Sequence, residues 1–358
     1  MKPTKALHDL GQSLWIDNIT RDMLDSGTLK RYIDEYSVTG LTSNPTIFDN
    51  AISNSDSYDD EVKRLFKAGS SGEALFFELA LQDLSRAADM FLPIHARTAS
   101  VDGYVSLEVS PLLAYDTKAT VASAKGLFER AHKPNLFIKI PGTQEGLPAI
   151  EEAIYSGVSV NVTLLFSSQH CRDAADAYMK GLERRVAEGL SPDVRSVASV
   201  FVSRWDKAVI EKVPAELKDK LGITVSTQAY RDYRDMLDSD RWQQLQSMGA
   251  RPQRLLFAST STKDPSAPDT LYVEALAAPN TVNTTPDKTL LAFGDHGKLS
   301  GVLSRDGGDC EDMLAAFEKA GISISGLAAQ LQQEGAASFA KSWEDLLQSI
   351  ETKSKALG

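Results

Sequence analysis

The sequence is poor in cysteine and lacks long apolar runs. Only two of its 358 residues are cysteines, Cys171 and Cys310, which are too few for a disulfide framework and lack the spacing of a metal site. No stretch is apolar over the length of a membrane span, and the segment MKPTKALHDLGQSLW lacks the apolar centre of a secretion signal. These absences predict a protein of the reducing cytoplasm that has no membrane as a partner.

Nucleotide-binding glycine motifs and metal-binding patterns are also absent. No G-x-G-x-x-G follows a strand-like run, no Walker A motif occurs, and GSSGEA at residues 69–74 has the wrong glycine spacing. No two histidines stand at the spacing of metal ligands, so we expect neither a metal nor an organic cofactor. The histidines are His8, His95, His132, His170 and His296.

Positive charge is in deficit. The chain has 38 Lys and Arg against 49 Asp and Glu, which gives a formal net charge of -11, and its pI is near 5.1. A phosphate backbone requires a basic face, so this balance argues against nucleic acid or an anionic membrane as a partner. An anionic substrate would therefore have to bind in a local basic pocket.

Strand-like and helix-like segments alternate along most of the chain. Short apolar or β-rich runs begin near residues 15, 40, 104, 136, 159, 196, 254 and 281, and amphipathic helical stretches separate them. Such alternation predicts a parallel sheet, and eight units suggest a closed (β/α)8 TIM barrel. Pattern alone leaves an open, doubly wound sheet as an equal alternative, because the last run, TVNTT, is too polar for periodicity to identify it.

Two further segments predict additional helices. Residues 206–252 are long, charged and helical, which favours a helical insertion on the outside of the barrel, and residues 310–358 predict a helical tail. The sequence has no repeats, low-complexity tracts or proline-rich linker. We therefore expect one domain over residues 1–358, as a monomer or a homodimer.

Polar residues occur in or directly after several of the predicted strands. Chemistry collects at the C-terminal ends of barrel strands, although each of these residues except Lys139 also has an ordinary explanation as a turn former, cap or strand residue. They are Asp17, Asn44, Glu108, Lys139, Asn161, Thr163, Ser199 and Arg204.

Lys139 stands out because it interrupts the apolar run NLFIKIPGT, and lysine is almost never fully buried unless it is paired. Free lysine titrates near ~10.4, so only about one in a few thousand carries a neutral amine at pH 7. Apolar surroundings lower the pKa and turn a lysine into a nucleophile that forms an imine with a carbonyl. Cleavage next to such an imine needs a base and a held water, which Asp17, Glu108 and Thr163 could supply.

Four segments resemble the transaldolase family in the right order. GLTSNPTIF at residues 40–48 is similar to the first transaldolase signature, and LFIKIPGTQEGLPAIEEA at 136–153 is similar to the signature around the Schiff-base lysine. VNVTLLFS at 160–167 and VASVFVSR at 197–204 look like strands five and six of that family. The chain length and tail resemble the long bacterial subgroup, without the isomerase domain to which some of its members are fused.

The resemblance implies a role for each candidate residue. It implies Lys139 as the imine-forming nucleophile, Asp17 as the acid and base at the C4 hydroxyl, and Glu108 acting through a water held with Thr163. Asn44 and Asn161 would orient the dihydroxyacetone unit, and Ser199 and Arg204 would bind the sugar phosphate. The implied reaction belongs to the pentose phosphate pathway: a dihydroxyacetone unit passes from fructose 6-phosphate or sedoheptulose 7-phosphate to an aldose phosphate.

One segment departs from the short transaldolases, which carry A-S-F-R after strand seven. This chain reads ASTSTKDP, with Ser261 in place of the arginine, and we expect Lys263 to replace it with help from Ser261 and Ser259.

The alternatives are a related aldolase that releases free dihydroxyacetone and a barrel that binds sugar phosphates without catalysis. The related aldolases tend to have glutamine at the position of Glu108 and tyrosine at that of Phe201, so both residues favour transfer. A zinc-dependent aldolase is disfavoured by the scattered histidines.

Overall fold

Eight parallel strands close into a barrel in chain order, β1-β2-β3-β4-β5-β6-β7-β8, in a computed structural model that describes residues 1–358. This confirms the TIM barrel and excludes the open sheet. Each predicted run overlaps one strand. The strands are β1 (Gln12–Asp17), β2 (Val38–Thr42), β3 (Val105–Glu108), β4 (Leu136–Pro141), β5 (Val160–Leu165), β6 (Ser196–Phe201), β7 (Arg254–Ala258) and β8 (Thr281–Thr285).

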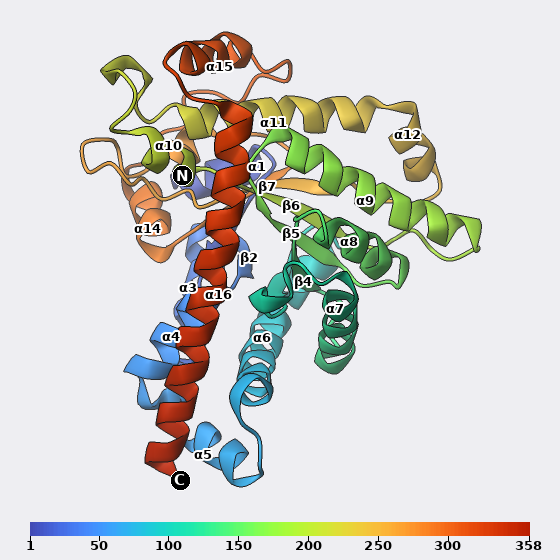
Figure 1. Ribbon diagram of the computed structural model, residues 1–358, viewed down its shortest axis with the longest axis vertical. Helices are drawn as coiled ribbons and strands as arrows, with labels where there is room; N and C mark the ends of the chain where they lie inside the picture. Colours follow the sequence, from blue (N-terminus) through green and yellow to red (C-terminus); the bar gives the residue numbers. More distant parts are fainter.

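Helices surround the barrel, and the last of them runs along the length of the molecule (Figure 1). The α-helices are α1 (Pro3–Asp9), α2 (Arg21–Asp25), α3 (Thr28–Tyr36), α4 (Pro45–Asn54), α5 (Asp59–Lys67), α6 (Gly72–Arg97), α7 (Thr117–Ala131), α8 (Gly146–Tyr155), α9 (Ser168–Ala187), α10 (Ser203–Val209), α11 (Leu221–Asp238), α12 (Asp240–Ser247), α13 (Leu271–Ala275), α14 (Asp287–His296), α15 (Cys310–Lys319) and α16 (Ile324–Leu357). Three short 3-10 helices are η1 (Asp56–Tyr58), η2 (Pro111–Leu113) and η3 (Ala215–Leu217).

Strand β8 forms although its sequence, TVNTT, is polar. It pairs with β1 on one side and β7 on the other, and all five of its residues are buried. Thr284 faces the pocket at the C-terminal end of the barrel, which explains why an apolar side chain is not required there.

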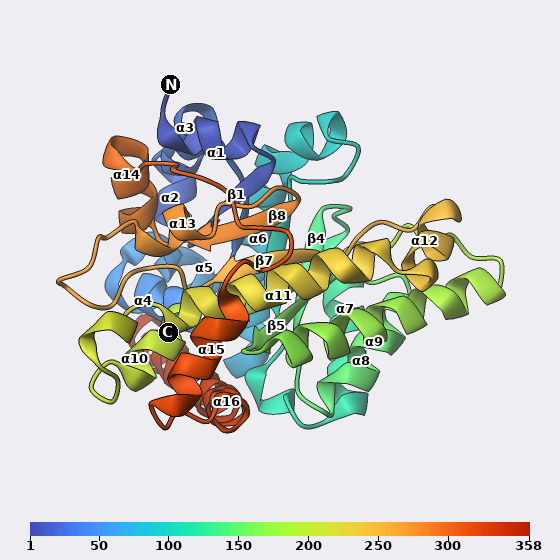
Figure 2. The same cartoon turned by 90° about the horizontal axis from the view of Figure 1, so that it is seen from above.

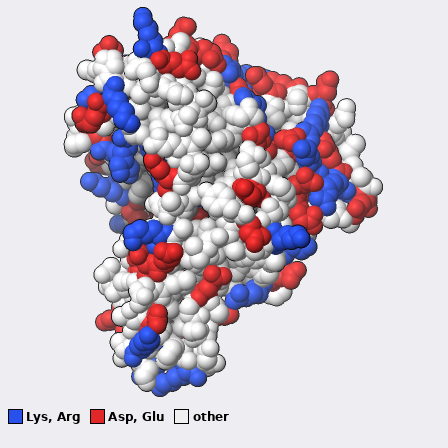
Figure 3. Space-filling view, in the orientation of Figure 1, with Lys and Arg blue, Asp and Glu red and all other residues white.

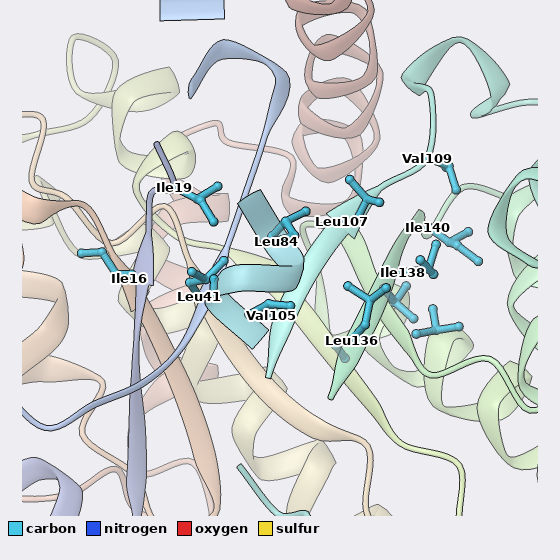
Figure 4. Close-up of a cluster of buried hydrophobic side chains, with 14 of the residues drawn as sticks. Ile16, Ile19, Leu41, Leu84, Val105, Leu107, Val109, Leu136, Ile138 and Ile140 are labelled. Atoms are coloured by element: carbon cyan, nitrogen blue, oxygen red, sulfur yellow. The ribbon is translucent and has the colours of Figure 1, made fainter. Parts of the chain in front are cut away.

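Side chains alternate between two environments along each strand. On β4, Leu136, Ile138 and Ile140 point outward and join the apolar layer between the barrel and its helices, as Figure 4 shows. Phe137 joins the cluster inside the barrel instead, and Lys139 lies two residues further along the same inward-facing row.

Aromatic side chains fill the N-terminal end of the barrel interior. Tyr104 stacks on Phe137 with ring centroids 4.2 Å apart, and Trp15 lies 6.1 Å from Phe137. The Trp15 indole donates a hydrogen bond to Asp102 at 2.8 Å. Gly40 allows this packing, because a Cβ there would lie 2.7 Å from the Trp15 ring. The interior is therefore aromatic toward this end and polar at the other.

The segment between β6 and β7 contains α10, η3, α11 and α12, and α11 lies beside α9 and α15 (Figure 2). After β8 come α14, α15 and the 34-residue α16, which packs against α4, α5, α6 and β5. No helix is both long enough and apolar enough to cross a membrane. On the face shown in Figure 3, positive and negative side chains are interspersed rather than gathered into one basic surface.

Candidate active site

A pocket of about 180 Å³ lies at the C-terminal end of the barrel and brings together ten of the eleven predicted site residues. The eleventh, Glu108, contacts Lys139 from the neighbouring strand. Larger cavities lie beside α9 and α11 and at the opposite end of the barrel, but they contain none of these residues. The predicted residues in the pocket are Asp17, Asn44, Lys139, Asn161, Thr163, Ser199, Phe201, Arg204, Ser261 and Lys263.

Lys139 is buried at the centre of this site, with 6% of its surface exposed. Its ammonium donates one hydrogen bond to the Ser43 carbonyl at 2.9 Å and another to Glu108 Oε2 at 3.3 Å. Burial raises the pKa of Glu108, and the positive charge of Lys139 opposes that rise. The carboxyl group of Glu108 lies within hydrogen-bonding reach of the lysine, as proton exchange between them requires.

Asp17 ends β1 at the edge of the same pocket, and its Oδ1 accepts a hydrogen bond from the Thr42 hydroxyl at 2.9 Å. Burial raises the pKa of Asp17, while the charge of Lys139 and hydrogen bonds from Thr42 and Asn44 lower it. Two carboxyl groups with raised pKa values therefore line the same site as one lysine, an arrangement suited to proton transfer.

The two asparagines differ in what holds them. Asn44 caps the N-terminus of α4 by accepting a hydrogen bond from the Ile47 amide at 3.1 Å, so its turn-forming and pocket-lining roles coexist. Asn161 is fully buried inside the barrel, where it donates to Ser106 at 3.2 Å and accepts from Ser199 at 2.7 Å. The Ser199 hydroxyl thus orients Asn161 in this structure.

Two buried oxygens in the site have no protein hydrogen-bond partner, namely Glu108 Oε1 and Thr163 Oγ1. Buried polar atoms are normally satisfied, so such atoms mark a place for a water or a substrate group. Directly after Thr163, Leu164 has a φ of 59°, and the pairing register of β5 and β6 shifts between Val162 and Leu165. A bulge of this kind is common beside active sites, where it redirects side chains.

Positive charge gathers at the other end of the pocket. The Arg204 guanidinium lies 5.2 Å from the Phe201 ring centroid and 5.6 Å from that of Phe339, and burial lowers its pKa. Lys263 donates to Ser261 at 2.5 Å. Burial and the nearby charges of Lys207 and Arg204 lower the pKa of Lys263. Cations that repel one another in this way would be stabilised by a bound dianion such as a phosphate.

The sequence did not reveal three of the groups around this site. Thr42 and Thr284 could have been found from strand alternation, because each lies on the same inward row as the strand-end polar groups. Phe339 lies on α16, far from the predicted motifs, and carries no local signal. It lines the pocket with its ring centroid 5.9 Å from Lys139 Nζ.

No group of three or more His, Cys, Asp or Glu side chains is placed to hold a metal ion. The reactive side chains gathered at this site are an amine, two carboxyl groups and a threonine hydroxyl.

Comparisons with known proteins point to one family. The family model described as transaldolase/fructose-6-phosphate aldolase matches residues 14–350. A transaldolase of Saccharopolyspora erythraea is 44% identical over 353 residues, covering 97% of this chain and 96% of that protein. Transaldolases of an Arthrobacter species and of Thiobacillus denitrificans are 43% and 41% identical, covering 98% of this chain and 96% and 100% of their own lengths.

Proposed function

The chain belongs to the transaldolase/fructose-6-phosphate aldolase family and is a transaldolase, and we propose that it transfers a dihydroxyacetone unit through an imine on Lys139. The observation that carries this mechanism is the burial of Lys139 between the Ser43 carbonyl and the Glu108 carboxyl group. No cofactor is required, because the protonated imine itself accepts the electron pair of the broken bond.

The first step joins the lysine to the ketose. Glu108 takes a proton from Lys139, and the neutral amine adds to the C2 carbonyl to give a carbinolamine. Loss of water then gives the imine, with Glu108 supplying the proton for the departing hydroxyl. The unpartnered Glu108 Oε1 and Thr163 Oγ1 support a water held between these two side chains.

The second step breaks the C3–C4 bond. Asp17 removes the proton of the C4 hydroxyl, the bond electrons pass into the imine, and the aldose leaves with a new carbonyl at its C1. A three-carbon enamine stays on Lys139 and adds to the next aldehyde by the reverse sequence. The raised pKa of Asp17 supports this role, because the same group must accept and return a proton.

The cationic end of the pocket would bind the phosphate of both donor and acceptor. Arg204 provides a planar set of donors that matches phosphate oxygens, and Lys263 and Ser261 face the same region. Asn44 and Asn161 would hold the hydroxyl groups of the dihydroxyacetone unit. The expected substrates are fructose 6-phosphate or sedoheptulose 7-phosphate with erythrose 4-phosphate or glyceraldehyde 3-phosphate.

An aldolase that releases dihydroxyacetone is the alternative within the family. Phe201 favours transfer, because its ring lies against Arg204 and Phe166 and offers no hydroxyl to bind a hydrolytic water. The carboxyl group of Glu108 favours transfer as well, since the related aldolases tend to have glutamine at this position.

We place this reaction in the pentose phosphate pathway of the cytoplasm. Both cysteines are free and buried, which suits a reducing compartment. One buried hydrophobic cluster contains residues of the barrel, of α10 and of α16, which supports one domain over residues 1–358 with the α10–α12 segment and the tail as additions.

The deciding experiment follows glyceraldehyde 3-phosphate release from fructose 6-phosphate over many turnovers, with and without erythrose 4-phosphate. Sustained release only in the presence of the acceptor supports transfer, whereas equal release without it would mean a hydrolysing aldolase. Borohydride reduction in the presence of fructose 6-phosphate should attach a three-carbon adduct to Lys139. Absence of that adduct would refute the imine.

A further inference from the structure

We propose that Phe339 closes the active site toward solvent and thereby sets how much of the three-carbon intermediate is transferred and how much is hydrolysed. The proposal rests on the imine mechanism above and adds to it a residue from outside the barrel. It assigns to α16, a helix that contributes none of the predicted catalytic groups, control over the fate of the intermediate.

Hydrogen bonds on both sides of Phe339 hold α16 over the strand ends. Gln332 donates to the Gly142 carbonyl at 3.0 Å and to the Leu164 carbonyl at 2.9 Å. Gly142 directly follows β4, and Leu164 lies at the bulge of β5, so these bonds fix the helix above the two strands that carry Lys139 and Thr163.

On the other side, the Thr46 hydroxyl of α4 bonds to Ser342 at 2.9 Å. The ring between these anchors therefore has a defined position.

The Phe339 ring bridges the catalytic and the phosphate-binding ends of the pocket. Its centroid lies 5.9 Å from Lys139 Nζ and 5.6 Å from the centre of the Arg204 guanidinium, and it meets the Phe201 ring edge to face at 6.3 Å. The residue lines the pocket and is itself only partly exposed. The ring therefore stands at the boundary between the imine site and bulk water.

Release of free dihydroxyacetone needs one step that transfer does not, and that step takes a proton from water beside this ring. The enamine must take a proton at the carbon that would attack the aldehyde, which gives the imine of dihydroxyacetone. The water held at Glu108 and Thr163 then adds to the imine carbon, as it does when a ketose product is released, and the C–N bond breaks to give dihydroxyacetone and the Lys139 amine. An aromatic ring offers a water no oxygen or nitrogen partner, and water occupies buried sites only where it finds such partners.

The position of Phe339 beside Arg204 also permits a narrower role, in which the ring only orients the guanidinium. The two roles predict different effects on KM and on the ratio of hydrolysis to transfer. Loss of Arg204 orientation would raise KM for phosphorylated sugars, so the ratio of hydrolysis to transfer would rise only with a phosphorylated acceptor. Loss of the barrier to water would raise that ratio with phosphorylated and unphosphorylated acceptors alike.

The test uses full-length Phe339→Ala and Phe339→Leu, with Ser338→Ala as the matched control because Ser338 is exposed on the same turn of α16. Dihydroxyacetone release from fructose 6-phosphate is measured without acceptor, and sugar transfer is measured with erythrose 4-phosphate and with unphosphorylated erythrose. Phe339→Ala should raise the hydrolysis-to-transfer ratio about tenfold, which corresponds to about 1.4 kcal/mol between the two barriers. Phe339→Leu should restore most of the wild-type ratio, and Ser338→Ala should not change it.

A wild-type ratio in a folded Phe339→Ala protein would overturn the proposal, and so would a change confined to KM for phosphorylated sugars. If Phe339→Ala fails to fold, Gln332→Met takes its place: it removes both bonds to the strand-end carbonyls and should raise the same ratio, and a wild-type ratio there would likewise overturn the proposal. Borohydride trapping distinguishes failure of this proposal from failure of the imine mechanism. A wild-type enzyme that forms no adduct on Lys139 would refute the mechanism itself.

Discussion

The ammonium of Lys139 lies 3.3 Å from the carboxylate of Glu108, and the two residues are register partners on β4 and β3. Both side chains are buried, with exposed fractions of 8% and 4%. A buried pair of this kind costs desolvation energy and contributes little net stability, so its presence is better explained by the chemistry of the lysine than by folding.

Replacing Lys139 by methionine should therefore have two separable effects. The amine is lost, so activity should fall at least ~10³-fold and borohydride should attach nothing. The cation that lowers the pKa of Glu108 is also lost. The pKa of Glu108 in the folded protein should therefore rise further above its value in the unfolded chain. The unfolded chain then binds fewer protons than the folded one, and stability should fall as pH rises, by up to about 1.4 kcal/mol per pH unit.

Urea unfolding of Lys139→Met and the wild type at several pH values between 5 and 8 measures this slope. The double variant Lys139→Met/Glu108→Gln has no carboxyl group at this position and should show a slope flatter than that of the single variant. Parallel slopes for the single and the double variants would contradict the raised pKa of Glu108.

The eight strand and helix units could be predicted from sequence because their cause is local, whereas the pattern alone did not distinguish a closed barrel from an open sheet. Parallel strands buried on both faces are short and apolar, and the helices between them are amphipathic, so each unit is visible in a window of the sequence. Even β8 can be located by its β-branched residues and its position in the alternation, although it is too polar for periodicity to identify it as a strand. Lys139 was visible for the opposite reason, since a charge in an apolar strand breaks the pattern.

The position of α16 over the active site could not be predicted, because it depends on contacts between residues that are far apart in the sequence. The tail could be predicted as helical, but nothing in its pattern says that it crosses β4 and β5. The ring of Phe339 in an amphipathic helix has the same sequence signature as any core residue. A weak signal does exist in Gly335, because glycine in a helix interior costs about 1 kcal/mol relative to alanine and so suggests a close approach.

The hydrogen bond from Thr42 to Asp17 should shape the pH dependence of the reaction. Because this bond lowers the pKa of Asp17, Thr42→Val should raise that pKa further. Asp17 acts as a base when it is ionised, so the acid limb of kcat/KM should move to higher pH. Thr42→Ser keeps the hydroxyl and should leave the limb near its wild-type position.

Asp17→Asn should lower kcat by ~10²–10⁴-fold, the range typical of a general base, and should remove this limb. Profiles of kcat/KM from pH 4 to 8 distinguish these outcomes. If the acid limb does not move in Thr42→Val, a group other than Asp17 determines it.

Lys263 should contribute to phosphate binding in place of the arginine of the short transaldolases. Lys263→Ala should raise KM for fructose 6-phosphate about tenfold or more, because a hydrogen bond between charged groups is worth about 1.5–3 kcal/mol. Dihydroxyacetone carries no phosphate, so its use as a donor should be unaffected. Lys212→Ala removes an exposed lysine outside the pocket and serves as the control. Equal losses with both donors would argue against a phosphate-binding role.

Gly335→Ala should separate the stability of α16 from its function. A Cβ at this position would lie 2.9 Å from Leu164 Cδ2 and 3.1 Å from Arg204 Nη1, both on side chains that can move. The helix gains about 1 kcal/mol from alanine, which offsets much of the strain, so the melting temperature should change little. Arg204 must shift to make room, so KM for phosphorylated sugars should rise several-fold. Gly126→Ala in α7 meets no atom within 4 Å and should raise the melting temperature without changing KM. An unchanged KM in Gly335→Ala would mean that the close contact of α16 with Arg204 does not influence substrate binding.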